Sequence, residues 1–548
     1  MRQVHRAEAK RMNAEPAVGN ERMRPFRIPR SRSPAHQFCR WRPVDAILFG
    51  CPSENAKKAG EQPMQPSVRS GWSHPPFPPI IPAGPVPMNR RFSKHIPVMA
   101  LLAAQGCGPE GSTGRPAPAS PGIDVRDAAA VSARNVRILW EPKASGSVRI
   151  DRALGDGPFV PVATKPARHG RFLDLALTPE TTYRYQLSHC SGDTACGTGL
   201  VLEPITTPPT RLPPFQVEVP PEGTQDDIVV FGLETLDPDA LRVARMAGVD
   251  RHGVVVWEYY RKQELLGPVT EVQLLDDGSL ATGHNASFVR LGLDGSELYR
   301  YEGNTAHHDI DPISGGRFIF LTFDVFADQL GDPILGDGIE IVREGDPFPS
   351  WSWRARDHIS RDDREPIDWE NVMFGIGRDW THANALTFDE QAGKIYVNVR
   401  NLNRIYCLAY PSGEVLWVLG DGGDFGQGLF AHSHDPYFLS HDRFLVFDNG
   451  ALRPGATHDY SRIIEVEFDA DARRAEIVWE YRESPDFFSF AQGAIGVQGD
   501  GNVFVTDGIN ARIFEITRDK RKVWQLRLPP EVWTYKAVTV PRAVFEAW

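Results

Sequence analysis

The sequence predicts an all-β protein in which a small β-sandwich precedes a six-bladed β-propeller. From about residue 215 onward, apolar strands and turns recur in units of roughly 40–60 residues, which is the sequence signature of propeller blades. Several units end in a strand that carries a tryptophan after a turn with Asp, Gly or Glu. The 49 glycines and 46 prolines of the 548-residue chain suit many strands joined by turns.

Residues 1–87 lack the pattern of a folded domain. They hold 15 prolines and carry a net charge of +8, while the whole chain carries −11. Such a segment cannot bury enough apolar surface to offset the entropy of ordering it, so we expect it to be disordered. We also expect that translation begins at Met88 and that these residues are an upstream artefact. The remaining residues then carry −19, and such an acidic body argues against nucleic acid as a partner.

Residues 88–107 have the layout of a secretory signal peptide. A basic start precedes a short apolar run, and Cys107 follows small residues, as in signals that end at a lipobox cysteine. We therefore expect export to the cell envelope, with a lipid anchor on Cys107 that holds the protein at a membrane or in the periplasm. The alternative is a plain signal peptide, because Ala104 and Gln105 depart from the usual lipobox. Residues 108–122, rich in Gly, Ser and Pro, would form a tether.

Residues 123–207 predict the small β-sandwich. The stretch at 136–140 alternates apolar and polar side chains as a half-buried strand does. The later stretch LTPETTYRYQLSHC resembles the fibronectin type III pattern, in which a threonine-tyrosine turn enters a late strand. Cys190 and Cys196 can close a short disulfide loop in an oxidising compartment, and two unpaired thiols are the alternative.

Residues 215–548 predict the propeller. The innermost strand of each blade runs along the central channel, so the residues at the starts of these strands converge on the axis from distant points in sequence. Tryptophans in the outer strands are expected to pack between blades. These are Trp257, Trp417, Trp479 and Trp524.

Histidines recur at the starts of the predicted inner strands. His307 and His308 open one inner strand, His382 opens the next, and His432 and His434 open the one after. Converging neutral imidazoles suit a metal site, or a nucleophile with general acid and base partners. Between the first two histidines, we expect the ring of His308 to face the channel.

The segments that follow these histidines carry a resemblance. DWTHANAL, VNVRNLNRIYCLAYPSGEVLWVLG, HSHDPYFL, VFDNGALRP and YSRIIEVEFD resemble the bacterial arylsulfate sulfotransferases. The similarity covers roughly residues 225–530, and residues 379–466 are its specific part. It implies a six-bladed propeller in which one histidine is transiently sulfated. It further implies phenolic sulfate esters as donors, phenols as acceptors, and no nucleotide sulfate or other cofactor.

The resemblance also implies roles for single residues. His434, in SHD where the family has QHD, is the expected sulfated residue. His382 matches the histidine of the family's H-x-N pattern, and Arg400 matches the arginine that follows the next strand. His307 and His308 match an early histidine pair. The residues expected to contact the substrate are Asn384, His432 and Asn449.

The chemistry of sulfuryl transfer supports these assignments independently. Like phosphoryl transfer, it has a loose in-line transition state that leaves little covalent work for the protein. A neutral imidazole must attack sulfur, for which His434 is placed. A planar guanidinium suits the sulfuryl oxygens, and Arg400 supplies one. An acid for the departing phenolate and a base for the acceptor are available in His382 and His308.

Three alternatives remain at this stage. A non-catalytic surface propeller that binds a partner is favoured by Asn398, Asn403 and Ser433, which stand where the family usually has serine, serine and glutamine. A metal-dependent enzyme is less favoured, because carboxylates accompany the histidines only at Asp309 and Asp435, and we expect no metal. A quinone-dependent propeller dehydrogenase rests on analogy of fold alone.

Overall fold

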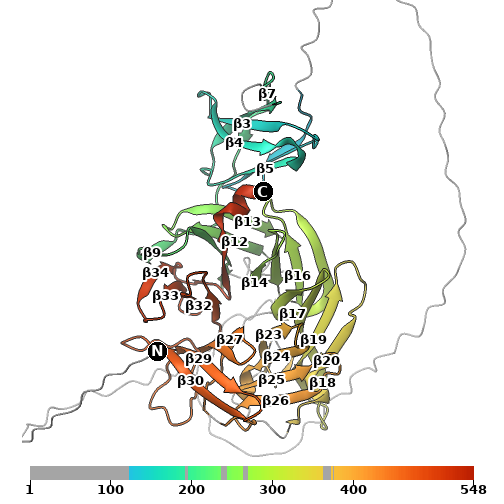
Figure 1. The fold of residues 1–548 in the computed structure, drawn as a ribbon, viewed down its shortest axis with the longest axis vertical. Helices are drawn as coiled ribbons and strands as arrows, with labels where there is room; N and C mark the ends of the chain where they lie inside the picture. The colour runs from blue at the N-terminus through green and yellow to red at the C-terminus, as the bar shows by residue number, and fades with distance from the viewer. Residues whose placement is uncertain are drawn as a thin grey trace, which may run out of the picture. The chain divides into compact units, whose positions relative to one another are not determined.

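The computed structural model describes the sandwich and the propeller, which are built almost entirely of β-strands (Figure 1). The segment 1–87, the signal peptide at 88–107 with Cys107, and the tether before residue 122 lie outside the described residues. Within the described part of the chain, no helix is both long and apolar enough to cross a bilayer. The described residues are 122–191, 196–235, 243–262, 269–284, 286–361, 372–373, 376–426 and 428–548.

The first eight strands form two sheets that share one core. One sheet has the order β1-β2-β5 and the other β4-β3-β6-β7, with β8 paired to β6. In β2 the alternation read from the sequence places Val136, Ile138 and Trp140 inside, where they pack against residues of the other sheet. The strands are β1 (Val125–Ala130), β2 (Val136–Trp140), β3 (Ser147–Leu154), β4 (Val160–Pro166), β5 (Arg171–Asp174), β6 (Thr182–Cys190), β7 (Leu200–Val201) and β8 (Ile205–Thr206).

The predicted threonine-tyrosine turn is present at the start of β6. The hydroxyl of Tyr183 accepts a hydrogen bond of 2.9 Å from the backbone N–H of Thr178, which ties the strand to the turn before it. A disulfide joins Cys190 to Cys196, as the sequence predicts. The specific assignment to the fibronectin type III class stays a prediction.

Six four-stranded antiparallel units follow and form the blades of a β-propeller, which Figure 1 shows succeeding one another in chain order. Blade 1 contains β10 (Asp227–Gly232), β12 (Val243–Asp250), β13 (Val255–Lys262) and β36 (Ala537–Pro541). Blade 2 contains β14 (Val269–Leu274), β15 (Leu280–His284), β16 (Ala286–Leu291) and the first part of β17 (Glu297–Ile313). Blade 3 contains the rest of β17, β18 (Arg317–Ala327), β19 (Pro333–Arg343) and β20 (Trp351–Arg354). Blade 4 contains β23 (Ala383–Asp389), β24 (Lys394–Val399), β25 (Arg404–Ala409) and β26 (Val415–Gly420). Blade 5 contains β27 (His434–Ser440), β28 (Arg443–Asp448), β29 (Arg462–Asp469) and β30 (Arg474–Tyr481). Blade 6 contains β31 (Ala494–Val497), β32 (Val503–Asp507), β33 (Arg512–Ile516) and β34 (Lys522–Arg527), with β9 (Gln216–Val219) paired to its outer edge.

Blades 2 and 3 share one long strand. The first part of β17 pairs with β16 up to Ala306, and from the same residue onward the strand pairs with β18. A bulge between His307 and Ile310 interrupts this second ladder. The sharing carries the chain directly from the outer edge of one blade to the axis of the next.

The ring is closed by the C-terminal strand. β36 pairs antiparallel with β10, with Val540 opposite Ile228, and so becomes the innermost strand of blade 1. The inner strands β36, β14, β17, β23, β27 and β31 contact one another in that order. The sequence predicted a propeller over residues 215–548 but did not reveal that the inner strand of blade 1 comes from the other end of the chain.

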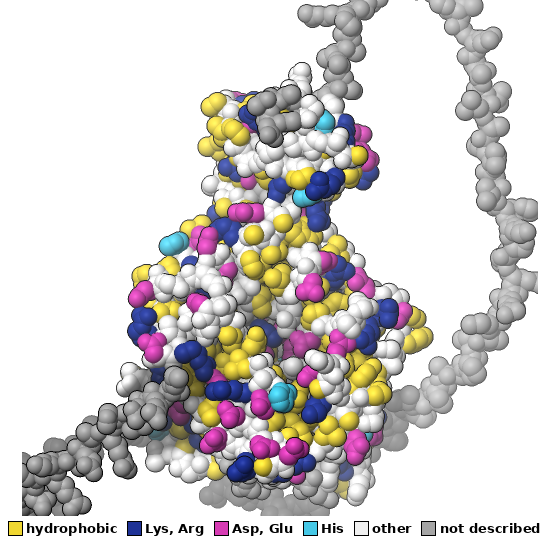
Figure 2. Space-filling view, in the orientation of Figure 1, with side chains coloured by type: hydrophobic (Ala, Val, Ile, Leu, Met, Phe, Trp, Pro, Cys, Tyr) yellow, Lys and Arg dark blue, Asp and Glu magenta, His cyan; other side chains and the backbone are white. Residues whose placement is uncertain are grey.

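The outer-strand tryptophans pack between blades as predicted. Trp257, Trp417 and Trp524 are buried, and Trp479 is half-buried against the neighbouring blade. Trp524 donates a hydrogen bond of 2.8 Å to the carbonyl of Arg251 in blade 1, so it also links the two ends of the ring. On the face of the molecule seen in Figure 2, basic and acidic side chains are interspersed.

Candidate active site

The predicted histidines lie where inner strands start, and the backbone there is left-handed. The φ angle is +55° at His308, +48° at His382, +51° at His432 and +58° at Gln492. Residues other than glycine seldom adopt this conformation, which is costly and concentrates at functional sites. The turns bring side chains from several blades to one place on the axis.

The histidines do not occupy one equivalent position in the strand ladders. His307 and His434 each belong to a ladder pair, opposite Leu321 and Phe447. His382 instead precedes the first ladder pair of β23. Their common property is the position at the start of an inner strand. A β-bulge next to each of them shifts the register of the ladder.

Three of these imidazoles and a tyrosine lie close together. The ring of His308 lies 5.2 Å from that of His382 and 5.6 Å from that of Tyr535, measured between centroids. The ring of Tyr535 lies 6.2 Å from that of His434. His308, His382 and His434 therefore belong to one cluster, as the sequence predicted, and Tyr535 is an addition to it.

The imidazole of His434 is held in one orientation by Asn449. The amide nitrogen of Asn449 donates to the carbonyls of Ser489 and Gln492, at 2.9 and 2.8 Å. Its oxygen therefore faces His434 Nδ1, 2.7 Å away, and can only accept. The proton of His434 must lie on Nδ1, which leaves a lone pair on Nε2.

His382 forms a pair with Asp379, a residue that the sequence analysis missed. The Nδ1 atom of His382 lies 2.5 Å from a carboxylate oxygen of Asp379, which also accepts from the amide of Asn401 at 3.1 Å. Burial alone would raise the pKa of Asp379, but His382, Asn401 and Arg400 together lower it. The three-residue spacing in DWTH was the signal that could have identified this carboxylate.

His307 supports His308 from behind. The two Nδ1 atoms lie 2.7 Å apart and share one proton, while His307 Nε2 lies 3.2 Å from Asp337. His307 also stacks on Phe323, with ring centroids 4.0 Å apart. Of the pair, His308 is the ring that reaches His382 and Tyr535, which agrees with the preference stated above for His308.

Arg400 supplies positive charge to this cluster. It begins a short 3-10 helix, Arg400–Leu402, directly after β24, and its guanidinium donates to Asn401 at 2.8 Å. Burial and the neighbouring charges, including that of Arg400, lower the pKa of His308 and of His434 well below the usual range. Both imidazoles are therefore neutral near pH 7.

A lysine clamp lies beside Tyr535. The ammonium of Lys536 is 3.0 Å from Glu271, 3.3 Å from Asp435 and 3.8 Å from Asp309. Burial alone would lower the pKa of Lys536, but these carboxylates raise it well above its usual range. We name these four residues the lysine clamp. The lysine of this clamp could not be predicted from local sequence patterns, because Lys536 reaches the axis only through the closing strand.

The residues expected to contact the substrate make hydrogen bonds within the protein, and their contact with a substrate stays a prediction. All three side chains are buried, and the amide of Asn449 is occupied as described above. Asn384 donates to the carbonyl of Ser433 and accepts from Asn398, at 2.9 and 2.6 Å. His432 Nδ1 lies 3.0 Å from the carbonyl of Ala451. These residues form the frame of the site.

The three departures from the family pattern belong to the same frame. Ser433 donates through its hydroxyl to Asn398 at 3.1 Å, so two of the departures contact each other. Asn403 accepts from the backbone N–H of His432 at 2.7 Å and is buried. Their side chains therefore take part in the hydrogen bonds that support the segment carrying His432 and His434.

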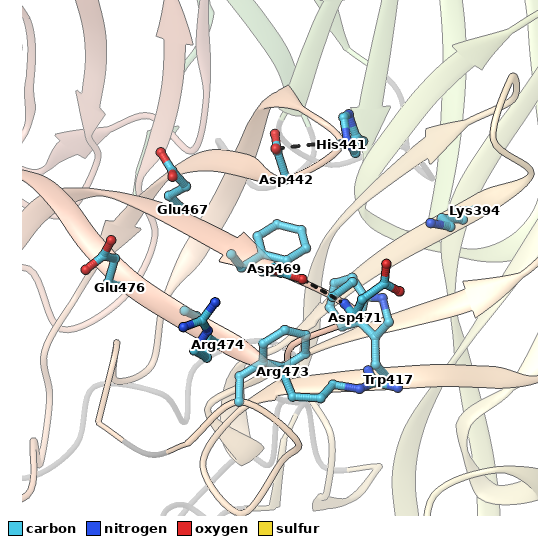
Figure 3. A pocket seen from close by; sticks show the side chains of 14 residues that line it. Lys394, Trp417, His441, Asp442, Glu467, Asp469, Asp471, Arg473, Arg474 and Glu476 are labelled. Carbon is cyan, nitrogen blue, oxygen red and sulfur yellow. Dashed lines mark hydrogen bonds and ion pairs between the residues drawn. The ribbon is translucent and has the colours of Figure 1, made fainter.

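A cavity of about 810 Å³ lies elsewhere, on the outer hairpins of blades 4 and 5 (Figure 3). It is lined by side chains of both charges around Trp417, including Asp442, Arg473 and Glu476, and it contains none of the clustered histidines. Its His441 follows the end of β27 that is opposite to His434. Seven extended residues span about 20 Å, so this cavity is about that far from His434. We therefore assign the candidate site to the histidine cluster and not to the cavity. Within the described residues, no group of three His, Cys, Asp or Glu side chains is arranged to hold a metal ion.

A comparison with protein families identifies one match. The model of the arylsulfotransferase (ASST) family matches residues 224–524, which is more than half of the chain and includes the whole histidine cluster except Tyr535. A search of curated proteins found no match.

Solved structures offer only weak similarities. A protein of unknown function from Bacteroides caccae is 11% identical, with 58% of this chain and 99% of that one covered and a TM-score of 0.36. Virginiamycin B lyase from Staphylococcus aureus is 12% identical, with 57% and 88% covered and a TM-score of 0.27. AztD from Citrobacter koseri is 9% identical, with 72% and 98% covered and a TM-score of 0.27. We draw no functional argument from them.

Replacing Lys536 should destabilise the protein more at high pH than at low pH. In Lys536→Met the carboxylates of Glu271 and Asp435 lose their buried cation, which should lower the free energy of unfolding by about 3–5 kcal/mol near neutral pH. Burial already raises the pKa of Glu271 well above its usual range. Because such a carboxyl favours the folded state only while it is protonated, the loss should shrink as the pH falls toward about 4.

Urea unfolding followed by tryptophan fluorescence, at about pH 5 and about pH 8, measures this effect. Lys522→Met is the matched control, because Lys522 pairs with Glu483 at 2.7 Å but is 22% exposed, and its loss should cost about 1 kcal/mol or less. Equal losses in the two variants would show that the clamp is not a buried ionic centre.

Proposed function

Because the chain belongs to the arylsulfotransferase family, we propose that it moves a sulfuryl group from aryl sulfates to phenols through an adduct on His434. The observation that carries this proposal is the hydrogen bond from His434 Nδ1 to Asn449. It fixes the tautomer that presents the Nε2 lone pair, and the low pKa of His434 keeps that lone pair available. A nucleophile prepared in this way suits covalent catalysis.

The first half-reaction breaks the bond between sulfur and the phenolic oxygen. The Nε2 lone pair of His434 forms an N–S bond, and the electron pair of the breaking S–O bond goes to the phenolate. Arg400 balances the negative charge on the sulfuryl oxygens with its planar guanidinium. The phenolate takes a proton from His382, whose Nδ1 atom is hydrogen-bonded to the carboxylate of Asp379 at 2.5 Å.

The second half-reaction reverses these roles. His382 is now neutral and accepts the proton of an incoming phenol. The phenol oxygen attacks sulfur, the N–S bond breaks, and its electron pair returns to Nε2 of His434. His308 stays neutral throughout, because burial and the surrounding charges hold its pKa well below the usual range.

We propose further that the protein works in the cell envelope and is anchored there through Cys107. The signal-like segment at 88–107 and the disulfide between Cys190 and Cys196 support this location, because disulfides persist in oxidising compartments. Mass spectrometry of the native protein should find a lipid-modified N-terminal Cys107. Detection of an unmodified Cys107 would exclude the anchor.

A donor supplied without acceptor should leave one sulfuryl group on His434. Nitrophenyl sulfate should release a stoichiometric burst of nitrophenol, and steady-state kinetics with a phenol should give parallel double-reciprocal lines. His434→Ala and His434→Gln should abolish both the adduct and turnover, since the attacking nitrogen is gone. Peptide mass spectrometry locates the adduct, and circular dichroism checks that both variants fold.

His441→Ala is the control for this experiment. His441 is 76% exposed and lies beyond the opposite end of β27, so its loss should leave the adduct and the rate unchanged. An adduct on another histidine in His434→Ala would mean that the nucleophile is misassigned. Intersecting lines without an adduct would indicate direct transfer in a ternary complex. Absence of transfer from every aryl sulfate would favour a binding propeller.

The burst rate should stay constant as the pH falls through about 6.5, the usual pKa of histidine. His434 must be neutral to attack, and its lowered pKa delays protonation to a more acidic pH. Nitrophenyl sulfate is the suitable donor, because its leaving group needs no proton. Arg400→Gln removes one cause of the low pKa, so its slower burst should lose rate at a higher pH than the wild type does. A wild-type burst rate that falls with a midpoint near pH 6.5 would contradict the assignment of His434 as a nucleophile with a lowered pKa.

A further inference from the structure

Tyr535 belongs to the cluster but has no role in the proposed mechanism. It lies just before β36, at the start of the inner strand of blade 1, where other blades place His382 or His434. Its ring meets those of His308 and His434 edge-on, at interplanar angles of 73° and 65°. It is only 8% exposed. The phenol therefore lies beside two of the clustered histidines.

The hydroxyl of Tyr535 is buried and has no hydrogen-bond partner among the described residues. The buried tyrosines of the sandwich differ in this respect, because the hydroxyl of Tyr185 donates to Asp174 at 2.7 Å and that of Tyr183 accepts from Thr178 at 2.9 Å. A buried polar group without a partner is costly, and in native proteins it calls for an explanation. A substrate oxygen in the site would satisfy it.

The neighbouring residue holds the phenol in place. Lys536 is fixed by Glu271, Asp309 and Asp435, which belong to three other blades. Because Tyr535 is bonded to Lys536 through the backbone, the lysine clamp restricts where its ring can lie. A donor that is positioned before the substrate arrives needs no reorganisation during the reaction.

The hydroxyl of Tyr535 keeps its proton. Burial, together with the carboxylates of Glu271, Asp309 and Asp435, raises its pKa well above the usual range. It is therefore a poor base and a poor nucleophile, but it remains an O–H donor near neutral pH. This favours a role as a hydrogen-bond donor over a role as a sulfuryl acceptor.

We propose that Tyr535 is a catalytic residue whose hydroxyl donates a hydrogen bond to the phenolic oxygen of the aryl sulfate as its bond to sulfur breaks. The proposal rests on the proposed function. His434 forms the N–S bond, the electron pair of the S–O bond moves to the phenolic oxygen, and that oxygen accepts the hydrogen bond. No proton leaves Tyr535, and the phenolate is protonated by His382 as before.

The phenolic oxygen is a better acceptor for the Tyr535 hydroxyl than the sulfuryl oxygens are. In a loose transition state the bond to the leaving group is largely broken, so negative charge develops on the departing oxygen. Arg400 already faces the sulfuryl oxygens in the proposed mechanism, and His308 is neutral with its Nδ1 engaged by His307. A neutral phenol donor beside a developing phenolate matches that charge.

Tyr535→Phe tests the proposal, because it removes one oxygen and leaves the ring. The variant should lower kcat/KM by roughly 10²- to 10³-fold for donors with poor leaving groups. The loss should be smaller for nitrophenyl sulfate, so a plot of log kcat/KM against leaving-group pKa should become steeper. Thermal stability should not fall, because the hydroxyl makes no hydrogen bond in the described part of the free protein.

Tyr396→Phe is the matched control. Tyr396 in β24 is also buried, its hydroxyl also lacks a partner among the described residues, and it packs on Phe438 and Trp417, away from the histidines. This variant should keep the wild-type rates and the wild-type slope.

Two results would overturn the role of Tyr535. One is a Tyr535→Phe variant whose leaving-group slope equals that of the wild type, and the other is a sulfuryl group found on Tyr535 after incubation with donor alone. Both are distinct from failure of the proposed function, in which the wild type itself forms no histidine adduct and releases no phenol from any donor.

Discussion

The arrangement of the site depends on the buried ionic contacts of Lys536. The closing strand brings this lysine to the axis, where Glu271, Asp309 and Asp435 approach it from blades 2, 3 and 5. Two of these carboxylates also accept hydrogen bonds of 2.7 Å from the next blades. Asp309 accepts from the backbone N–H of Leu386, and Asp435 accepts from that of Ile495. All six blades are thus joined around one ammonium. Without it, the carboxylates would repel one another beneath the histidines, so closure of the ring and construction of the site are one event.

The sequence revealed most of the fold, because strand alternation and the outer tryptophans are local patterns. It also revealed His308, His382 and His434, because histidines recur at the starts of inner strands, and through the resemblance to the family it pointed to Arg400. It could not reveal Tyr535 or Lys536, whose place follows only from the pairing of β36 with β10, a contact between the two ends of the propeller. The contact of Asn384, His432 and Asn449 with the substrate stays a prediction, and the sequence could not reveal the hydrogen bonds that these side chains make within the protein.

The departures from the family pattern have a physical explanation that bears on the alternative of a binding propeller. Asn398 and Ser433 are buried and bonded to each other, and both contact the segment that carries His434. Two coupled changes that still satisfy the buried polar groups can preserve the geometry of the histidines. The departures therefore do not indicate a disused site. The Nδ1 contact of His434 with Asn449 and the pairing of His382 with Asp379 are both intact.

The proposed reaction needs both a positive charge and a neutral imidazole in the same cluster. A sulfuryl donor is an anion and needs a cation, yet its nucleophile must be an unprotonated imidazole. Arg400 serves both needs in the proposed reaction, because the charge that faces the sulfuryl oxygens is also one cause of the low pKa of His434 and of His308. A carboxylate at the same distance would attract a proton to the nucleophile and repel the donor. Among the described residues, Asp379 supplies the only carboxylate that is hydrogen-bonded to His308, His382 or His434. It pairs with His382, which is the acid of the proposed reaction. In the proposed reaction the acid and the nucleophile therefore differ in the charge beside them: His382 pairs with the carboxylate of Asp379, and His434 lies near the guanidinium of Arg400. The sequence around the histidines does not show this difference.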